Sequence, residues 1–475
     1  MACACLLYCS TSFSQDLASD NPPLTLEKSV NIAIKNNLEV RQSELRSQRA
    51  SIVLGQSKRD LLPSISGNIG HGLNQGRSID PFTNAYIDQN VSFANYSLNG
   101  GITLFNGLLL QNTIQQNRYA LEAAKMEQEQ AKETLTLDVI LNYLQILSNE
   151  DLLNQAVLRA DLSEQQVRRL QVLDKEGAIA PSVLFDLQGQ LAEDELNIIN
   201  SRNALNASRL SLSQLMNVEY DPQLKVTRLT TDQFESPGKY PFTKSDIINS
   251  ALNQLSIIKG AVLRKESAGK GLQASRSLSY PNLSLNSNLF SNYSSLAFRN
   301  EFRGIQQVTS DNYVNISGTQ YPVIVPERIL SSEKIKYNDQ IKNNFSSSFS
   351  LNLRIPIFNS VYAKSRIAQA KVDVQQAEII EETTRLQIKQ AVDQAYFNMQ
   401  AAWDRLEAVN KQTEAFKKSF SAAEVRFNAG AGTSVDYYIA KNNFDRASIN
   451  LINVRYDYIL RTKILDYYRG ALMLN

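Results

Sequence analysis

One alternating segment in the second half of the chain limits its possible folds more than any other feature. Residues 344–359 read NFSSSFSLNLRIPIFN, and every second residue from Phe345 to Ile357 is Phe, Leu or Ile, except Ser347. The residues between them are serine, asparagine, arginine and proline. Strict alternation with a period of two predicts a β-strand that has one apolar face and one polar face.

The length of this strand is unusual for a water-soluble sheet, where about five or six residues are typical. At about 3.3 Å per residue, this segment would be roughly 43 Å long, and tilted by ~45° it would span roughly 30 Å. That distance matches the hydrocarbon thickness of a bilayer. We therefore predict a lipid-facing row on this strand, with the polar face lining a water-filled lumen. The predicted lipid-facing residues are Phe349, Leu351, Leu353 and Ile355.

Only four segments of the chain have this alternating pattern. They are Ile65–Leu73, Val91–Phe105, Leu283–Tyr293 and Phe345–Ile357. A change of phase near Asn95 predicts a β-bulge in the second of them. Four strands cannot close a barrel, and open strand edges are not tolerated in lipid. Several copies must therefore contribute: two would give a plugged barrel of about eight strands, and three a barrel of about twelve strands with an aqueous bore.

An internal repeat divides the chain into two halves. When the sequence is aligned with itself at an offset of 218 residues, Pro63 matches Pro281. At an offset of 253 residues, Gly177 matches Gly430. We expect a leading segment at 1–14, a first repeat at 15–235 and a second repeat at 236–475. The second half is longer by 35 residues, which we expect to form a polar loop within 293–343.

The remainder of each half has a helical pattern, so the fold class is mainly α with a membrane β-barrel. Helical segments are expected at Leu26–Arg59, Lys244–Ser275, Leu108–Glu176 and Val361–Asn428, each long one followed by a return helix. The two long segments contain no glycine or proline, and each would be roughly 100 Å long. Each long segment also has a cluster of apolar residues that is spaced for packing between helices. The cluster of the first half is Val139, Ile140, Tyr143, Leu144 and Leu147, and its counterpart in the second half is Val392, Ala395, Tyr396 and Met399.

The composition excludes several classes of function. The net charge of +2 gives no indication of nucleic-acid binding. The only cysteines are Cys3, Cys5 and Cys9, and the only histidine is His71. Removal of the leading segment would leave no cysteine, so thiol catalysis and Cys/His zinc sites are not expected. Any Ser-His-Asp triad would have to use His71. We expect no enzyme activity, no metal site and no cofactor.

The first fourteen residues resemble a secretory signal. MACACLLYCSTSFSQ has a short apolar centre followed by small polar residues, which predicts cleavage before Gln15. A frayed apolar terminus is the plainer interpretation. Lipid modification of Cys9 is disfavoured by Tyr8, because a small residue is expected at that position.

The repeated order of helix, proline, two strands, long helix, glycine turn and return helix resembles the TolC-type outer-membrane efflux proteins. The most specific match is FNAGAGTSVDYYIAKNNF (427–444), and its first-half equivalent is EGAIAPSVLFDLQGQL (176–191). The resemblance covers essentially the whole mature chain. It implies a homotrimer with a twelve-stranded barrel in the outer membrane of a Gram-negative bacterium, continuous with a helical periplasmic tunnel. It also implies a periplasmic adaptor (membrane fusion) protein and an inner-membrane pump of the RND or ABC type.

The two helical turns are the candidate adaptor-docking tips. Bare backbone at a glycine permits close approach by a partner, whereas the plainer interpretation is C-capping by a glycine in the left-handed conformation. The candidate docking residues are Gly177, Ala178, Gly430, Ala431, Gly432 and Thr433. Thr433 or Ser434 is expected to cap the return helix, and Pro181 to begin the equivalent helix of the first half.

Asp436 and Phe427 are the candidate pore-constriction residues, because the resemblance places an acid and an aromatic gate there. The plainer interpretations are an acid favoured by the helix dipole and an ordinary packing residue. This chain has Ile439 where the family often has a second acid, and Gly432 where it often has a latching arginine. The resemblance therefore does not extend to a charge-latched gate.

Three functions are compatible with these patterns. The first is an exit duct for small molecules, such as drugs or metabolites. The second is the outer-membrane channel of a type I protein-secretion system. The third is a periplasmic coiled-coil adaptor without a pore, which predicts a water-soluble protein.

Overall fold

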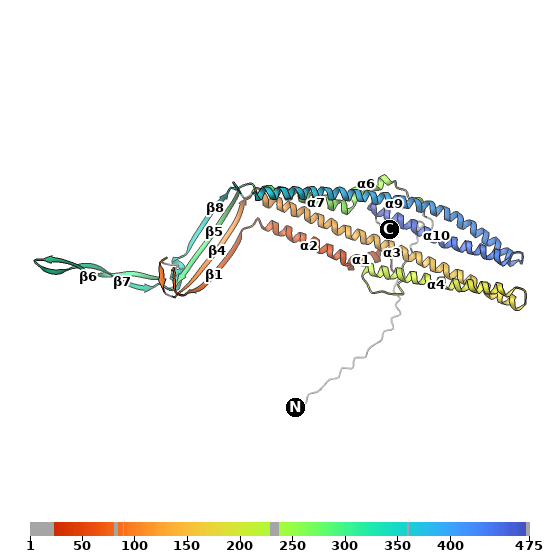
Figure 1. Cartoon of the computed structure of the whole chain (residues 1–475), viewed down its shortest axis with the longest axis horizontal. Helices are drawn as coiled ribbons and strands as arrows, with labels where there is room; N and C mark the ends of the chain where they lie inside the picture. Colours follow the sequence, from red (N-terminus) through yellow and green to blue (C-terminus); the bar gives the residue numbers. More distant parts are fainter. Residues whose placement is uncertain (1–22, 80–83, 89, 229–236, 359–360, 472–475) are drawn as a thin grey trace, which may run out of the picture. The chain divides into compact units, whose positions relative to one another are not determined.

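The computed structural model describes residues 23–79, 84–88, 90–228, 237–358 and 361–471 (Figure 1). The predicted leading segment 1–14 and the predicted repeat boundary at 235–236 therefore lie outside the described residues. The chain divides into two compact units that do not follow the sequence repeats. Of the described residues, the first unit contains those within 1–50, 120–265 and 377–475, and the second contains those within 51–119 and 266–376.

Both halves of the chain have the same order of elements. In the first half, α1 (Leu26–Asn36) and α2 (Leu38–Arg59) precede the strands, and α3 (Leu109–Lys175) and α4 (Pro181–Met216) follow them. In the second half, the corresponding helices are α6 (Lys244–Gln254), α7 (Ser256–Ser277), α9 (Tyr362–Asn428) and α10 (Ser434–Tyr468). The two long helices predicted at Leu108–Glu176 and Val361–Asn428 are confirmed to within one residue at each end, and each has 67 residues. No helix in the described ranges has a stretch long and apolar enough to cross a membrane.

The first helical segment of each half is broken, which the periodicity did not predict. Asn37 has extended backbone between α1 and α2, and Leu255 has extended backbone between α6 and α7. The side-chain oxygen of Asn37 accepts the N–H groups of Glu39 at 2.8 Å and Val40 at 3.2 Å. Asn37 therefore caps the start of α2, and this local hydrogen bonding competes with a continuous helix.

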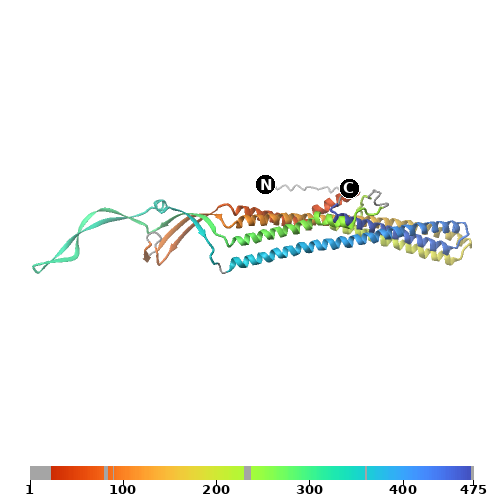
Figure 2. The same ribbon diagram turned by 90° about the horizontal axis from the view of Figure 1, so that it is seen from above.

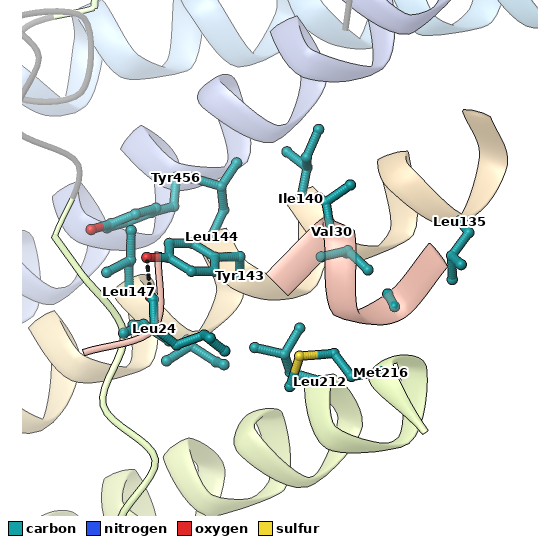
Figure 3. Packing of buried hydrophobic residues seen from close by; sticks show 14 of the residues in the cluster. Leu24, Val30, Leu135, Ile140, Tyr143, Leu144, Leu147, Leu212, Met216 and Tyr456 are labelled. Carbon is teal, nitrogen blue, oxygen red and sulfur yellow. Dashed lines mark hydrogen bonds between the residues drawn. The ribbon is translucent and has the colours of Figure 1, made fainter. Parts of the chain in front are cut away.

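The core of the first compact unit surrounds Tyr143 (Figure 3). Its hydroxyl donates to the backbone oxygens of Leu24 at 2.9 Å and Thr227 at 2.6 Å, so the buried phenol is satisfied. Val139, Ile140, Leu144 and Leu147 belong to the same cluster, which confirms the predicted packing face. The predicted counterpart residues Val392, Ala395, Tyr396 and Met399 lie in a second cluster with α6 and α10.

The second compact unit contains a four-stranded antiparallel sheet in the order β1-β4-β5-β8. Its strands are β1 (Ser64–Asn74), β4 (Val91–Phe105), β5 (Asn282–Ser294) and β8 (Ser346–Arg354). β8 has nine residues rather than the predicted thirteen, because the chain leaves the sheet shortly before Pro356, which has no N–H to donate. The bulge predicted near Asn95 is also wrong: pairing is continuous there, and the register shifts between Thr103 and Phe105.

The polar loop predicted within 293–343 is wrong. Most of this region is a long β-hairpin of β6 (Phe298–Ile316) and β7 (Thr319–Lys334), followed by the short helix α8 (Tyr337–Asn343). Figure 2 shows the hairpin as a twisted two-stranded ribbon. Its turn places Ser317 and Gly318 at φ values of 54° and 90°, the left-handed geometry that joins hairpin strands in tight turns. A shorter hairpin, β2 (Arg77–Ile79) and β3 (Tyr86–Asp88), joins β1 to β4.

Candidate functional site: an amphipathic sheet and two helical tips

One face of the four-stranded sheet is apolar across three strands. The register places Leu351 of β8 beside Leu285 of β5, and Leu285 beside Ile102 of β4. Leu353 lies beside Leu283 in the same way. Paired residues point to the same side of a sheet, so these side chains form continuous apolar rows.

The opposite face of the sheet consists of small polar side chains. Register pairing aligns Ser348, Asn288, Asn99 and Ser66 across all four strands. The side-chain nitrogen of Asn288 donates to the side-chain oxygen of Asn99 at 2.6 Å. Short hydroxyl and amide groups hydrogen-bond readily to water, so this face suits an aqueous lumen.

Three of the four predicted lipid-facing residues lie on the apolar face of β8. Phe349, Leu351 and Leu353 are exposed by 74%, 63% and 61% in the single chain. Ile355 is also exposed but lies beyond the end of β8. In the described sheet β1 and β8 are the edge strands, so their outward backbone groups have no partner strand in this chain. Lipid contact at these four residues remains a prediction.

Gly177 ends α3 with a backbone turn that caps the helix. Its φ is +66°, its N–H donates to the Asp174 oxygen at 2.9 Å, and the Ala178 N–H donates to the Leu173 oxygen at 2.8 Å. This pair of hydrogen bonds is the Schellman arrangement. Pro181 then begins α4 at its first position, as predicted.

Gly430 ends α9 with the same geometry. Its φ is +72°, its N–H donates to the Phe427 oxygen at 3.1 Å, and the Ala431 N–H donates to the Arg426 oxygen at 2.9 Å. The capping interpretation is therefore correct at both Gly177 and Gly430. A Cβ atom at either glycine would have no neighbour within 4 Å, so both positions open directly onto surrounding space.

Gly432 has a different structural role from the two capping glycines. Its φ is not in the left-handed region, but a Cβ atom there would lie 3.2 Å from the backbone nitrogen of Phe427. Close approach of the chain to the end of α9 therefore favours glycine. Thr433 is the N-cap of α10, and its hydroxyl accepts the Asp436 N–H at 3.1 Å, which confirms the predicted cap.

Asp436 lies in the first turn of α10, where the plainer interpretation places an acid favoured by the helix dipole. Its carboxylate accepts a hydrogen bond from the Thr433 hydroxyl at 2.7 Å, and its side chain is exposed. Ile439, one turn later, is 57% exposed. The geometry is that of a capping acid at a helix N-terminus. A place in a pore constriction remains a prediction.

Phe427 packs within the first compact unit. Its ring stacks on Tyr437 with centroids 5.0 Å apart, and the Arg169 guanidinium lies 5.7 Å from its centroid. Arg169 also donates to the side-chain oxygen of Asn428, so the α3–α4 and α9–α10 hairpins contact each other near their tips. The packing interpretation of Phe427 holds in the single chain, whereas its role as a gate is a prediction.

A buried ionic cluster between α3, α4 and α10 is not apparent in the sequence. Arg159 on α3 lies 2.7 Å from Asp194 on α4 and 3.3 Å from Asp445 on α10. Lys441 lies 3.0 Å from Asp445, and Ser163 donates to Asp194 at 2.5 Å. Two cations and two anions thus balance one another between three helices. In the described ranges, no group of three His, Cys, Asp or Glu residues is arranged to hold a metal ion.

Comparison with known proteins identifies the family. The family model described as "Outer membrane efflux protein" matches residues 30–218 and 247–466. The outer membrane protein TolC of Vibrio cholerae is 23% identical over 93% of this chain and 90% of its own length. TolC of Salmonella enteritidis is 21% identical over 92% of this chain and 80% of its own length.

Solved structures have the same fold at low sequence identity. The outer membrane protein VceC of Vibrio cholerae has a TM-score of 0.72 at 12% identity, covering 94% of this chain and 96% of its own. CusC has a TM-score of 0.73 at 15% identity, covering 94% of this chain and 91% of its own. The fold and the family match confirm the resemblance seen in the sequence: this chain belongs to the outer membrane efflux protein family and is an outer-membrane exit duct of an efflux system.

Proposed function

We propose that three copies of this chain form a duct that exports small molecules, working with a periplasmic adaptor and an inner-membrane pump. The observation that carries the proposal is the amphipathic four-stranded sheet, which has an apolar face, a polar face and two edge strands without partners in the chain. Backbone groups in hydrocarbon must all be paired, so β8 of one copy pairs with β1 of the next. Three copies give about twelve strands, enough for a water-filled bore.

The two tips, where α3 turns into α4 and α9 turns into α10, support docking of an adaptor. Gly177 and Gly430 present backbone without a side chain, next to Ala178 and Ala431. A partner helix or loop can approach such backbone closely, because no side chain holds it away. The protein itself carries out no chemistry in this role, and the energy for transport comes from an RND or ABC pump.

The trimer can be tested with introduced cysteines, because the only native cysteines are Cys3, Cys5 and Cys9. In a background with these three replaced by serine, Ser66→Cys on β1 is combined in turn with Ser346→Cys, Ser348→Cys or Ser350→Cys on β8. Oxidation of isolated outer membranes should give a covalent trimer for at least one pair. Monomers for every pair would contradict the proposed closure.

The cargo can be tested by deleting the gene and restoring it. Loss of the duct should raise the intracellular accumulation of fluorescent small-molecule efflux substrates, and restoration should reverse it. A cell that keeps normal dye efflux but fails to release one exported protein would instead support type I secretion.

A further inference from the structure

The β6–β7 hairpin has a distal half with almost no charge and many exposed apolar side chains. Between Gly304 and Pro326 the only charged residue is Asp311. The rest of the hairpin differs sharply, because it carries seven charged residues. They are Arg299, Glu301, Arg303, Glu327, Arg328, Glu333 and Lys334.

Both faces of the distal half are apolar. Tyr313 of β6 pairs with Pro322 of β7, so the two side chains are on the same face. Ile324, which pairs with Thr309, is two residues beyond Pro322 on β7 and therefore shares that face. Tyr321 and its partner Val314 lie on the other face, because successive residues of a strand point to opposite sides. Ile324, Tyr313, Tyr321 and Val314 are exposed by 61%, 58%, 53% and 51% in the single chain.

The two edges of this hairpin are poorly suited to binding a further strand. In the described sheets β6 and β7 pair only with each other. Pro322 and Pro326 interrupt the donors of β7, and register shifts between Phe302 and Gly304 and between Thr309 and Tyr313 interrupt β6. Prolines and bulges at an edge prevent strand addition. The faces, rather than the edges, are therefore available for contact.

A two-stranded hairpin is marginally stable on its own, and contiguous exposed apolar surface marks an interaction site. The near absence of charge argues against a polyanionic or polycationic partner and removes repulsion between copies of the hairpin. The hairpin also lies in the chain between β5 and β8, and β8 is the edge strand that meets a neighbouring copy in the proposed trimer. A three-fold ring gives each copy two neighbours, each contacted through a different surface.

We propose that the distal halves of three β6–β7 hairpins pack on one another, the Tyr313–Ile324 face of each copy against the Val314–Tyr321 face of the next. This inference rests on the proposed trimer, and it assigns a second subunit interface outside the four-stranded sheet. Two apolar faces and two blocked edges match a ring that closes by face-to-face packing. A dimer that used one face would leave the other exposed.

Cross-linking with a short bifunctional maleimide tests the arrangement in outer membranes. In the background without native cysteines, the double variant Val314→Cys/Ile324→Cys has one thiol on each face and should give covalent trimers. Each single variant should remain monomeric, because like faces do not meet. The matched control Arg299→Cys/Lys334→Cys has thiols on opposite faces of the charged half and should also remain monomeric.

The hairpin cysteines test the hairpin interface, whereas the β1–β8 cysteine pairs test the trimer itself. The two sets of results can therefore be distinguished. A trimer at the β1–β8 pairs with no hairpin cross-link would overturn the hairpin interface and leave the duct intact. Equal cross-linking of the single variants or of the charged-half control would overturn the face-to-face ring. Failure of the β1–β8 pairs as well would count against the proposed assembly.

Discussion

The guanidinium Nε of Arg159 on α3 lies 2.7 Å from the fully buried carboxylate of Asp194 on α4. Lys441 and Asp445 on α10 complete the cluster, with side chains that are 4% and 5% exposed. The three helices come from both halves of the sequence, so these charges hold the two helical hairpins together. A buried charge that loses its partner is costly, because neither water nor a counterion replaces that partner.

We predict that Asp194→Ala strongly destabilises the helical unit. Removing one partner of a buried ion pair costs about 3–5 kcal/mol, so the free energy of unfolding should fall by that amount. Denaturant titration followed by far-UV circular dichroism measures it. Glu164→Ala is the matched control, because it breaks an exposed pair with Arg168 and should cause no measurable change. Equal stability of both variants would show that the buried cluster contributes nothing.

Tyr143→Phe should destabilise the same unit at neutral pH. The phenol donates to the backbone oxygens of Leu24 and Thr227. The Leu24 oxygen also accepts the Thr227 N–H at 2.9 Å, so phenylalanine would remove a donor chiefly from the Thr227 oxygen. Losing one intramolecular hydrogen bond typically costs about 0.5–1.5 kcal/mol. Denaturant titration at pH 7 measures the loss, and Tyr86→Phe, at an exposed position of β3, is a control for the substitution itself. An unchanged midpoint for Tyr143→Phe would contradict the role assigned to this hydroxyl.

The stability contributed by Tyr143 should depend on alkaline pH. Burial raises the pKa of Tyr143 from 10.0 to about 12, so the fold favours the neutral phenol. The contribution is complete below the unfolded pKa of about 10 and falls as the pH rises towards 12, because only the unfolded state ionises in that range. The stability difference between wild type and Tyr143→Phe should therefore shrink above pH 10. A difference that is constant from pH 8 to pH 12 would contradict this.

Leu351→Arg should impair assembly in the outer membrane, whereas Asn352→Arg should be tolerated. Leu351 lies in the apolar row with Leu285 and Ile102, and Asn352 pairs with Ser284 on the polar face. An arginine in lipid near the midplane costs about 2–4 kcal/mol. Heat-modifiable migration of the outer-membrane fraction reports the assembled protein. Equal assembly of both variants would mean that the two faces have been assigned wrongly.

Gly430→Trp should abolish export without reducing the amount of trimer. Gly430 faces open space, so a large side chain there would hold an adaptor away rather than disturb the fold. Gly430→Ala imposes the same backbone strain at positive φ but adds only a methyl group. This variant therefore distinguishes a loss of helix capping from a steric block of adaptor docking. Dye accumulation and the yield of trimer should be measured for both variants. Equal loss of export in Gly430→Ala would favour capping alone.

Asp436→Asn should weaken the cation selectivity of a single channel while leaving folding intact. Three copies would place a ring of three Asp436 carboxylates around the tunnel axis, where such a ring concentrates cations. Asparagine keeps the side-chain oxygen that accepts from the Thr433 hydroxyl at 2.7 Å. Planar-bilayer recordings with and without a trivalent cation measure selectivity and block. Unchanged values would place Asp436 away from the pore.

Features that depend on local periodicity could be read from the sequence. The two 67-residue helices follow from long runs without glycine or proline, and Gly177 and Gly430 could be assigned as caps because left-handed backbone is a local requirement. The strand Val91–Phe105 was predicted with its observed bounds, because alternation records the two environments of a strand directly. The family resemblance depended on the order of these local elements.

Features that depend on contacts between distant residues were decided only by the tertiary structure. The pairing of β4 with β5 joins the two halves of the chain and aligns Asn99 with Asn288, which no local pattern specifies. The β6–β7 hairpin was mistaken for a loop, because its polar residues and two register shifts obscure the alternation on which strand prediction depends. The charges of Arg159, Asp194 and Asp445 look like ordinary solvent-exposed helix residues in the sequence. They become a buried, mutually neutralising cluster only because helix packing brings α3, α4 and α10 together, and burial is a property of the fold rather than of any one segment.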